Sequence, residues 1–340
     1  MSSLLERLEI AERQRTALVS TLLEEGTDCY RLFHGVSDGR PGLTVDRYGP
    51  VYLASLSERL PLDEVESQHL QSFLADRPCL TARRSGPRLE LVSESSAGLW
   101  ESRFHCRELG MEFAIELARA NRDPQLFLDF RAAKRAVRSV IAAAAEPVSV
   151  LNLFAYTCSV GCHAASAGAR EVFNVDFSGG NLAWGQRNFR RNGLSLEAEF
   201  LELDCVAALW AWSGNQKALS RHRASSRPAL SPRQFSVVVV DPPAFSKGKF
   251  ATVDLVNDPE TVYGPAWQVV APGGVLVAAN NSAKMKREVF EARLRRMFAK
   301  RSGHSEVEID WVSPDSDFPS FDSEPPLKVA FCRKPTTFPA

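Results

Sequence analysis

The sequence predicts an α/β protein, with a mostly parallel sheet between helices and a smaller α+β domain before it. The chain has 340 residues, which is long for a single hydrophobic core, so we expect two domains. Short strand-like segments separated by Gly/Pro turns fill the first third. After residue 120, strand-like and helix-like segments alternate, which is typical of a parallel, doubly wound sheet.

The first third is expected to hold one long helix and a small α+β domain. Leucines recur at helical spacing over residues 4–25, and Gly26 ends this pattern. Turn residues at 38–42 and 48–50 then separate segments with the composition of strands. We expect the helix to occupy 1–27 and the α+β domain 28–118. Its elements are strands at 30–34, 43–47, 51–56, 79–83 and 88–92, a helix at 62–74, and further strands and a linker over 95–120.

The remainder, residues 119–340, is expected to form the larger α/β domain. Segments 306–311 and 327–332 have no helix between them and should pair antiparallel. Residues 213–234 are rich in Ser, Arg, Pro and Gln, so we expect a flexible insertion there. The other expected elements are strands at 148–154, 171–175, 198–203, 236–240 and 275–279, with helices at 131–145, 162–167 and 182–191.

Composition argues against several classes of protein. Apolar residues make up 44% of the chain, charged residues 24%, and the net charge is zero, as in many globular proteins. The sequence has neither a long apolar run nor a signal-peptide pattern, so we expect a cytoplasmic protein without a membrane partner. The seven cysteines include no CxxC pair, and Cys158, Cys162 and His163 lack a second cluster, so no metal is expected.

Basic side chains concentrate in two stretches, 217–249 and 284–301. Such stretches suit a polyanionic partner such as RNA. A solvated helix face and a basic loop would have the same composition.

Four expected strands end in residues that suit a nucleoside, at the edge where open α/β sheets bind ligands. After the first strand, the segment Asn152-Leu-Phe-Ala-Tyr-Thr-Cys-Ser-Val-Gly161 forms a small-residue turn into a helix. Backbone N–H groups of such a turn can approach a carboxylate or phosphate, although an ordinary helix start looks the same. The glycine pattern of NAD-binding sites is absent.

The other three strands end in aspartates. Asp176 can accept both hydroxyls of a ribose, or it can cap the following helix. Asp204 could accept a hydrogen bond from an adenine amino group. The fourth strand leads into Asp241-Pro-Pro-Ala-Phe-Ser246, where two prolines stiffen the backbone and leave carbonyl groups for a polar base edge. Phe245 could pack on the face of that base, while the alternative is a plain strand-terminating turn.

These motifs resemble the bacterial 23S ribosomal RNA methyltransferase family, which includes cytosine-C5 and guanine-N7 enzymes. The resemblance is carried in order by DGRPGLTVDRYG at 38–49, FLDFR at 127–131, residues 151–161 and DPPAFS at 241–246. It implies a Rossmann-like class I methyltransferase domain with a mostly parallel seven-stranded sheet, and S-adenosyl-L-methionine as the cofactor. It also implies RNA as the partner and a small α+β domain that helps to bind it.

The resemblance implies roles for individual residues. Arg131 would pair with the methionine carboxylate, Asp176 would hold the ribose, and Phe177 would pack on the adenine. The residues implied in methyl transfer are Asp241, Pro242, Pro243, Phe245 and Asn280. The residues implied in cofactor binding are Phe127, Asp129, Arg131, Asn152, Phe154, Ala155, Tyr156, Thr157, Ser159, Asp176, Phe177, Ser178, Asp204, Cys205 and Asp241.

The chain departs from the family pattern in three places. Cys158 replaces the usual glycine, so we expect its Cβ to narrow the approach to the cofactor and to hinder a positive φ. The family's chains often begin with an RNA-binding PUA domain, and we expect none in residues 1–27, which are too few for one. The cysteine that cytosine-C5 enzymes use as nucleophile is absent after the fifth strand, where Asn280-Asn281-Ser282 stands.

We therefore predict methylation of a ring nitrogen, with a guanine of large-subunit rRNA as the target and no covalent cysteine intermediate. Three alternatives remain at this point. The enzyme could methylate another substrate, or the chain could be a catalytically silent relative that binds RNA or a protein partner. A NAD-dependent oxidoreductase is a weaker alternative, because the glycine fingerprint is missing.

Overall fold

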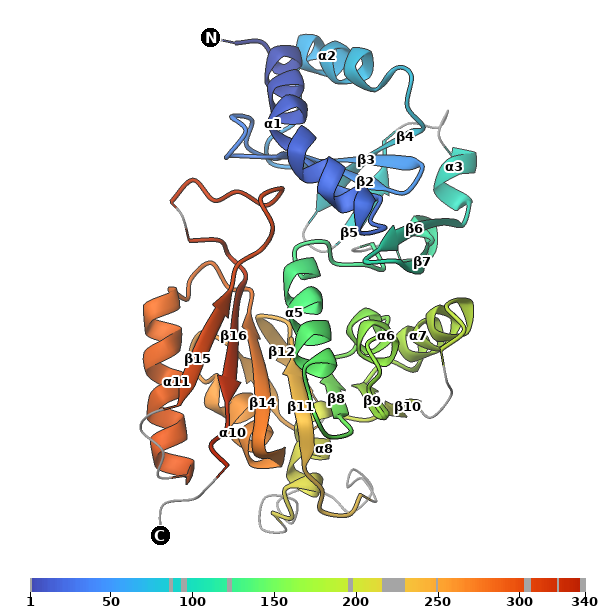
Figure 1. Ribbon diagram of the computed structural model, residues 1–340. Coiled ribbons are helices and arrows are strands. Elements are labelled where there is room, and N and C mark those ends of the chain that lie inside the picture. The colour runs from blue at the N-terminus through green and yellow to red at the C-terminus, as the bar shows by residue number, and fades with distance from the viewer. Residues whose placement is uncertain are drawn as a thin grey trace. The chain divides into compact units, whose positions relative to one another are not determined.

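The computed structural model describes residues 2–85, 88–92, 97–120, 124–194, 198–215, 230–248, 250–302, 307–322 and 324–336 (Figure 1). The chain divides into two compact units. Unit 1 comprises residues 1–131 and 314–323, and unit 2 comprises residues 132–313 and 324–340. The expected domain boundary at residue 118 thus differs from the one in the structure, because residues up to Arg131 and a later ten-residue segment belong to unit 1.

Unit 1 is built on a five-stranded sheet with two helices packed on it. The strands, in the order β1-β2-β3-β4-β5, are antiparallel except for the parallel pair β3–β4. Capping boxes at Ser3/Glu6 and Asp63/Glu66 begin α1 and α2, which share one apolar core with the sheet. The elements are α1 Leu4–Glu24, β1 Cys29–His34, β2 Leu43–Tyr48, β3 Val51–Ser57, α2 Glu64–Leu74, β4 Cys79–Ser85, β5 Arg88–Leu91, α3 Ala97–Glu101, the hairpin β6 Phe104–Glu108 and β7 Met111–Ile115, and α4 Leu117–Ala120.

The expected helix over 1–27 is therefore part of unit 1 and not a separate domain. Leu4, Leu8, Ala11 and Leu22 of α1 lie fully inside the apolar core that the small sheet also lines. An amphipathic helix of this kind is stabilised mainly by burying its apolar face against another element.

Unit 2 contains the expected seven-stranded sheet, in the order β10-β9-β8-β11-β14-β16-β15. Five strands are parallel, and β16 pairs antiparallel with β15, as the sequence predicted. It also pairs antiparallel with β14, which was not predicted. The strands are β8 Ser149–Leu153, β9 Glu171–Asp176, β10 Ala198–Glu202, β11 Phe235–Val240, β14 Val270–Asn280, β15 Glu308–Val312 and β16 Lys328–Arg333, with a small hairpin of β12 Phe245–Lys247 and β13 Thr252–Asp254.

Helices cover both faces of this sheet. The large apolar core of unit 2 joins α8, α10 and α11 to one face, which includes Phe173 and Val175 of β9. Residue Asn174 between them points to the opposite face, where Gly161 of α6 approaches it closely. The helices are α5 Arg131–Ala142, α6 Ser159–Ser166, α7 Gly179–Arg191, α8 Cys205–Trp212, α10 Glu260–Val269 and α11 Arg287–Ser302 (Figure 1).

Several elements of unit 2 were not expected from the sequence, namely α8, α10, α11 and the β12–β13 hairpin. Most of the predicted insertion at 213–234 lies outside the described residues, which resume at Leu230. In the part of the chain that the structure describes, no helix is long and apolar enough to cross a membrane.

Candidate functional site

The predicted strand ends meet at one edge of the seven-stranded sheet. Strand pairing places Leu201, Val175, Leu153, Val240 and Ala278 in one row across five parallel strands. One step further along the chain, the next row contains Asp176, Phe154 and Asp241. Neighbouring strands lie about 4.8 Å apart, so the backbones at Asp176 and Asp241, two strands apart, are about 10 Å from each other.

The loop after β8 has an unusual backbone. Phe154, Tyr156 and Cys158 adopt positive φ values of 56°, 49° and 60°, a conformation that is uncommon for residues other than glycine. Strain of this kind is typical of functional sites, where the surrounding structure must hold it. Residues 154–158 are hereafter called the β8 loop.

Most backbone donors of the β8 loop are used inside the protein. The N–H groups of Phe154, Ala155, Tyr156 and Cys158 donate to Cys205 Sγ, Val175 O, Asp176 Oδ2 and Ala155 O, at 2.7–3.3 Å. The expectation that this turn offers a row of free N–H groups to a carboxylate is therefore wrong for these four. The loop is instead hydrogen-bonded to the end of β9 and to the first residue of α8.

Cys158 does not occupy the place that the sequence predicted for its side chain. It precedes α6 as the N-cap residue, its side chain is fully buried, and burial raises the pKa of its thiol. Its Sγ lies 3.8 Å from the carbonyl oxygen of Tyr156 and lies against Gly185 of α7. The positive φ is adopted despite the Cβ, and the side chain packs against the neighbouring helix.

Asp176 ends β9 and has the features expected of a ribose-binding carboxylate. Its Oδ2 accepts from the N–H of Tyr156 and its Oδ1 from that of Ser178, both at 2.9 Å. Burial raises its pKa above the usual value, with these two hydrogen bonds opposing the shift. The side chain of Asn181 adds a third hydrogen bond to this carboxylate. A carboxylate can accept about four hydrogen bonds, so capacity remains for a hydroxyl group.

The residues that follow Asp176 present an aromatic ring and begin α7. Phe177 is 70% exposed, which is unusual for so large an apolar side chain. An exposed ring of this kind can stack on a planar group of a ligand. Ser178 is the N-cap of α7 and its hydroxyl accepts from the N–H of Asn181.

Asp204 and Cys205, which follow β10, form hydrogen bonds within the protein. Asp204 is the N-cap of α8, where Oδ1 accepts from Val206 and Ala207, and Oδ2 accepts from the N–H of Phe250 at 3.3 Å. The Cys205 thiol is buried and donates a hydrogen bond to Val175 O, and burial raises its pKa. Adenine contacts by these two residues stay predictions.

The Asp241–Phe245 segment leads from β11 into the β12–β13 hairpin. Pro242 is buried, whereas Pro243 is exposed and Phe245 is 57% exposed. The hydroxyl of Tyr263 in α10 donates to Ala279 O at 2.5 Å. Burial raises the pKa of Tyr263, and the negative charge of Asp241 adds a smaller contribution in the same direction. Tyr263 was not predicted, and its place in α10 gave no signal in the sequence.

Asn280, predicted to act in methyl transfer, is fully buried at the end of β14. Its Nδ2 donates to Leu255 O at 3.2 Å and its Oδ1 accepts from the N–H of Ser282 at 3.0 Å. The buried Lys328 of β16 donates from Nζ to Ser282 O at 2.7 Å. These contacts fix the turn over 280–282, and a part for Asn280 in methyl transfer stays a prediction.

Asn152 likewise turns its amide into the protein. It is 2% exposed, and its Nδ2 donates to Asn174 Oδ1 at 2.9 Å between β8 and β9. Ala155 and Thr157 are also buried within the β8 loop, and Ser159 is the first residue of α6. A cofactor contact from any of these four remains a prediction.

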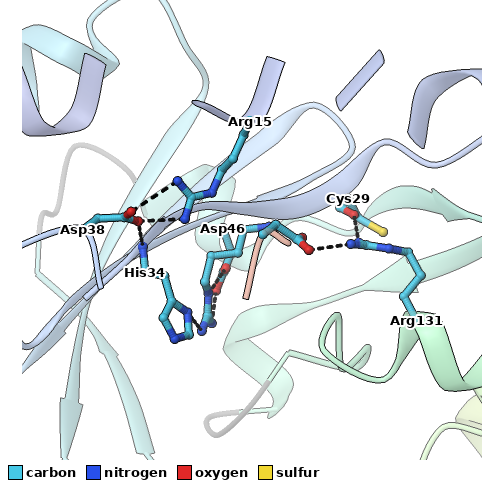
Figure 2. Close-up of polar contacts among 8 residues, drawn as sticks. Arg15, Cys29, His34, Asp38, Asp46 and Arg131 are labelled. Atoms are coloured by element: carbon cyan, nitrogen blue, oxygen red, sulfur yellow. Dashed lines mark hydrogen bonds and ion pairs between the residues drawn. The ribbon is translucent and has the colours of Figure 1, made fainter. Parts of the chain in front are cut away.

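Arg131 makes its contacts within unit 1. Its guanidinium is fully buried and donates to Asp315 Oδ2 at 2.8 Å and to Asp317 Oδ1 at 2.7 Å. It also donates to Cys29 O at 3.0 Å (Figure 2). Its pairing with a methionine carboxylate stays a prediction. Phe127, 42% exposed, and Asp129 also belong to unit 1, so their cofactor contacts stay predictions.

The DGRPGLTVDRYG motif has an internal, structural explanation. Asp38 accepts from both Arg15 Nη atoms and from the N–H of His34, while Asp46 forms a two-point ion pair with Arg31 at 2.7 and 2.9 Å (Figure 2). Gly49 has φ +59° and a Cβ there would lie 2.2 Å from His105 O. The motif therefore fixes the turn and ties β2 to α1 and β1.

Comparisons with known proteins agree with this arrangement. A sequence model described as S-adenosylmethionine-dependent methyltransferase matches residues 84–332. The chain belongs to this methyltransferase family. It is 26% identical over 323 residues to ribosomal RNA large subunit methyltransferase I of Aeromonas salmonicida, covering 93% of this chain and 75% of that protein.

Solved structures share the fold. A putative methyltransferase complexed with SAH has a TM-score of 0.75 at 19% identity, covering 97% of this chain and 80% of the other. A SAM-dependent methyltransferase from Agrobacterium tumefaciens has a TM-score of 0.66 at 18% identity, covering 92% of both. The predicted class I fold, methyltransferase activity and S-adenosylmethionine cofactor are thereby confirmed for this methyltransferase. Among the described residues, no group of His, Cys, Asp and Glu could hold a metal ion.

Proposed function

We propose that this methyltransferase acts on RNA, at a ring nitrogen of a guanine in large-subunit rRNA, by direct transfer. The observation that carries this proposal is the set of aligned strand ends, with Asp176, Phe177, Asp241 and Phe245 at one edge of the sheet. Support for the substrate comes from the similarity to relatives whose names specify the large ribosomal subunit.

The residues present fit S-adenosylmethionine, which supplies an electrophilic methyl group when bound. The remaining acceptor capacity of Asp176 suits a ribose hydroxyl, and the exposed ring of Phe177 suits the adenine face. The spacing of about 10 Å between the backbones at Asp176 and Asp241 leaves room for the ribose and the methionine side between them.

The target base would lie at the Asp241–Phe245 segment. The carboxylate of Asp241 and the carbonyl of Pro242 can accept hydrogen bonds from the polar edge of a guanine, and the exposed ring of Phe245 can stack on its face. A ring nitrogen already has a lone pair, so the protein needs only to align it and exclude water.

The local chemistry favours direct transfer over a covalent cysteine intermediate. Residues 280–282 at the end of β14 are Asn-Asn-Ser. Cys205, which follows β10 at the same edge of the sheet, is buried and hydrogen-bonded, and burial raises the pKa of its thiol. A nucleophilic cysteine requires an accessible thiolate, which raised pKa values disfavour.

The alternatives carry different weight. A non-rRNA substrate would use the same cofactor site and is an outcome of the test below. A catalytically silent protein was suggested mainly by Cys158, and the packing of that side chain against Gly185 removes this argument.

The test supplies methyl-labelled S-adenosylmethionine with separately purified 23S rRNA, 16S rRNA and tRNA from a strain lacking the gene. We expect label in 23S rRNA only, and label confined to protein or small molecules would overturn the RNA substrate. RNA containing 5-fluorocytidine should form no adduct with the enzyme on a denaturing gel. A stable adduct would contradict direct transfer.

A further inference from the structure

The β8 loop touches helix α7 at two buried positions. Gly185 of α7 faces Cys158, and Asn188, one turn later, donates from Nδ2 to Thr157 O at 3.0 Å. Gly185, Asn188, Thr157 and Cys158 are all buried. Helices α6 and α7 pack directly on each other (Figure 1).

The contact between Cys158 and Gly185 leaves no room for a larger residue. A Cβ at position 185 would lie 2.3 Å from Cys158 Sγ, 2.7 Å from Cys158 Cβ and 3.3 Å from Thr157 O. The Cβ of Cys158 is fixed by the backbone and its Sγ is one bond away, so neither atom can move far without moving the loop. If residue 158 were glycine, the two contacts under 3.0 Å would be removed, and the nearest remaining one would be the tight contact with Thr157 O at 3.3 Å.

The second half of the β8 loop, residues 156–158, is thus held by the segment that begins at Asp176. The N–H of Tyr156 donates to Asp176 Oδ2, Thr157 O accepts from Asn188, and Cys158 fits against Gly185. Because α7 starts directly after the carboxylate, one rigid helix fixes the loop relative to the ribose position.

We propose that Cys158 and Gly185 form a matched pair, and that Gly185 and Asn188 are positioning residues that hold the β8 loop in its cofactor-binding shape. This inference rests on the proposed assignment of the β8 loop to S-adenosylmethionine. Glycine at 185 provides the space that permits a side chain at 158 where the family usually has none. The pair therefore restores the loop that a cysteine alone would displace.

The experiment measures the dissociation constant for S-adenosylhomocysteine by calorimetry in four proteins: wild type, Gly185→Ala, Cys158→Gly and the double variant. We expect Gly185→Ala to bind at least tenfold more weakly, and Cys158→Gly to bind within threefold of wild type. The double variant should return to within threefold of wild type, because the clash needs both side chains. A double variant as weak as Gly185→Ala would overturn the proposal, as would unchanged binding by Gly185→Ala.

Gly180→Ala is the matched control. It lies on the same helix, is exposed, and a Cβ there would meet only Ser178 Oγ at an ordinary 3.8 Å. It should bind as wild type does. If Gly185→Ala is insoluble, recovery of soluble, binding-competent protein in the double variant supports the pair, and continued insolubility contradicts it.

A kinetic measurement separates positioning from general destabilisation. In Asn188→Ala, KM for S-adenosylmethionine should rise at least fivefold, while kcat at saturating cofactor and KM for RNA stay within twofold of wild type. A fall in kcat with unchanged KM for the cofactor would contradict the positioning role. If the wild-type protein does not bind S-adenosylhomocysteine, the assignment of the β8 loop to the cofactor is wrong. If the protein binds S-adenosylhomocysteine but does not methylate RNA, the proposed substrate is wrong and the binding results remain valid.

Discussion

Replacing Asp317 with alanine should destabilise unit 1 more than any surface substitution. Asp317 is fully buried, its Oδ1 accepts from Arg131 Nη2 at 2.7 Å, and its Oδ2 accepts from the N–H of Arg31 at 3.0 Å. The variant leaves the buried guanidinium of Arg131 with Asp315 as its remaining carboxylate, and it deprives a backbone donor of its acceptor.

The expected size follows from these contacts. Removing one partner of a buried ion pair costs about 3–5 kcal/mol, because the other charge stays buried. Asp315 offsets part of this loss, whereas the orphaned N–H of Arg31 adds about 1 kcal/mol. We expect a net loss of about 3–4 kcal/mol, or roughly a hundred- to several-hundredfold in the opening equilibrium.

Hydrogen–deuterium exchange measures this loss where it occurs and needs no assumption of two-state unfolding. Peptides from β1 and from residues 314–322 should exchange about a hundredfold faster in Asp317→Ala, while β8 and β11 peptides keep their protection. The control is Arg13→Ala, whose exposed pair with Glu9 at 3.8 Å should contribute less than about 1 kcal/mol. Changes below threefold in β1, or equal changes throughout both units, would refute the reasoning.

Three further substitutions test the cofactor site, the substrate site and the charge network. Asp176→Asn should weaken S-adenosylhomocysteine binding by about 30-fold or more, since a carboxylate accepts stronger hydrogen bonds than an amide, and calorimetry showing wild-type affinity would rule out the ribose assignment. Phe245→Ala should lower kcat/KM for RNA about tenfold through lost stacking of about 1–3 kcal/mol, with cofactor affinity unchanged; an equal loss of cofactor affinity would argue against its place at the substrate. Burial, then the positive charge of Arg31, lowers the pKa of His34 to about 4 from 6.5, against opposing contributions from Asp38 and Asp46. The unfolded chain therefore binds more protons between pH 4 and 6.5, so stability should fall as the pH falls through this window. Urea titrations of His34→Gln should give a shallower pH dependence there, and an unchanged slope would contradict this sign.

Much of the larger unit could be predicted because its signals are local. Valine-rich runs predict buried strands, and the polar residues directly after them predict the functional edge of a parallel sheet. Asp176, the last residue of β9, and Asp241, directly after β11, were predicted as site residues in this way. The antiparallel pairing of β15 and β16 followed from the lack of a helix between them.

The remaining features depend on contacts between residues distant in sequence. Arg131 pairs with Asp317 across 186 positions, and no local pattern signals that the segment at 314–323 joins unit 1. The space beside Cys158 is provided by Gly185 on another helix, so the cysteine alone suggested a damaged loop. Helix α8 is apolar on nearly all sides and therefore lacks the amphipathic period by which helices are recognised.

Helix α11 was missed for a different reason. Its apolar residues Phe290, Leu294 and Phe298 recur at helical spacing and are buried, yet the many basic residues around them dominated the interpretation. Several of these cations have partners within the protein: Arg295 with Glu291, Arg296 with Glu260 and Arg287 over the ring of Trp311. A charge run alone therefore gave little information on RNA binding.

The central claim is that the chain transfers a methyl group from S-adenosylmethionine to a guanine ring nitrogen of large-subunit rRNA. The most direct measurement incubates the enzyme with methyl-labelled cofactor and 23S rRNA from a strain lacking the gene, then identifies the labelled nucleoside by mass spectrometry. We expect label in a ring-N-methylated guanosine with the wild-type enzyme. At low cofactor concentration, the Asp176→Asn variant should give no labelled nucleoside. Label in 5-methylcytidine, or in no nucleoside at all, would contradict it.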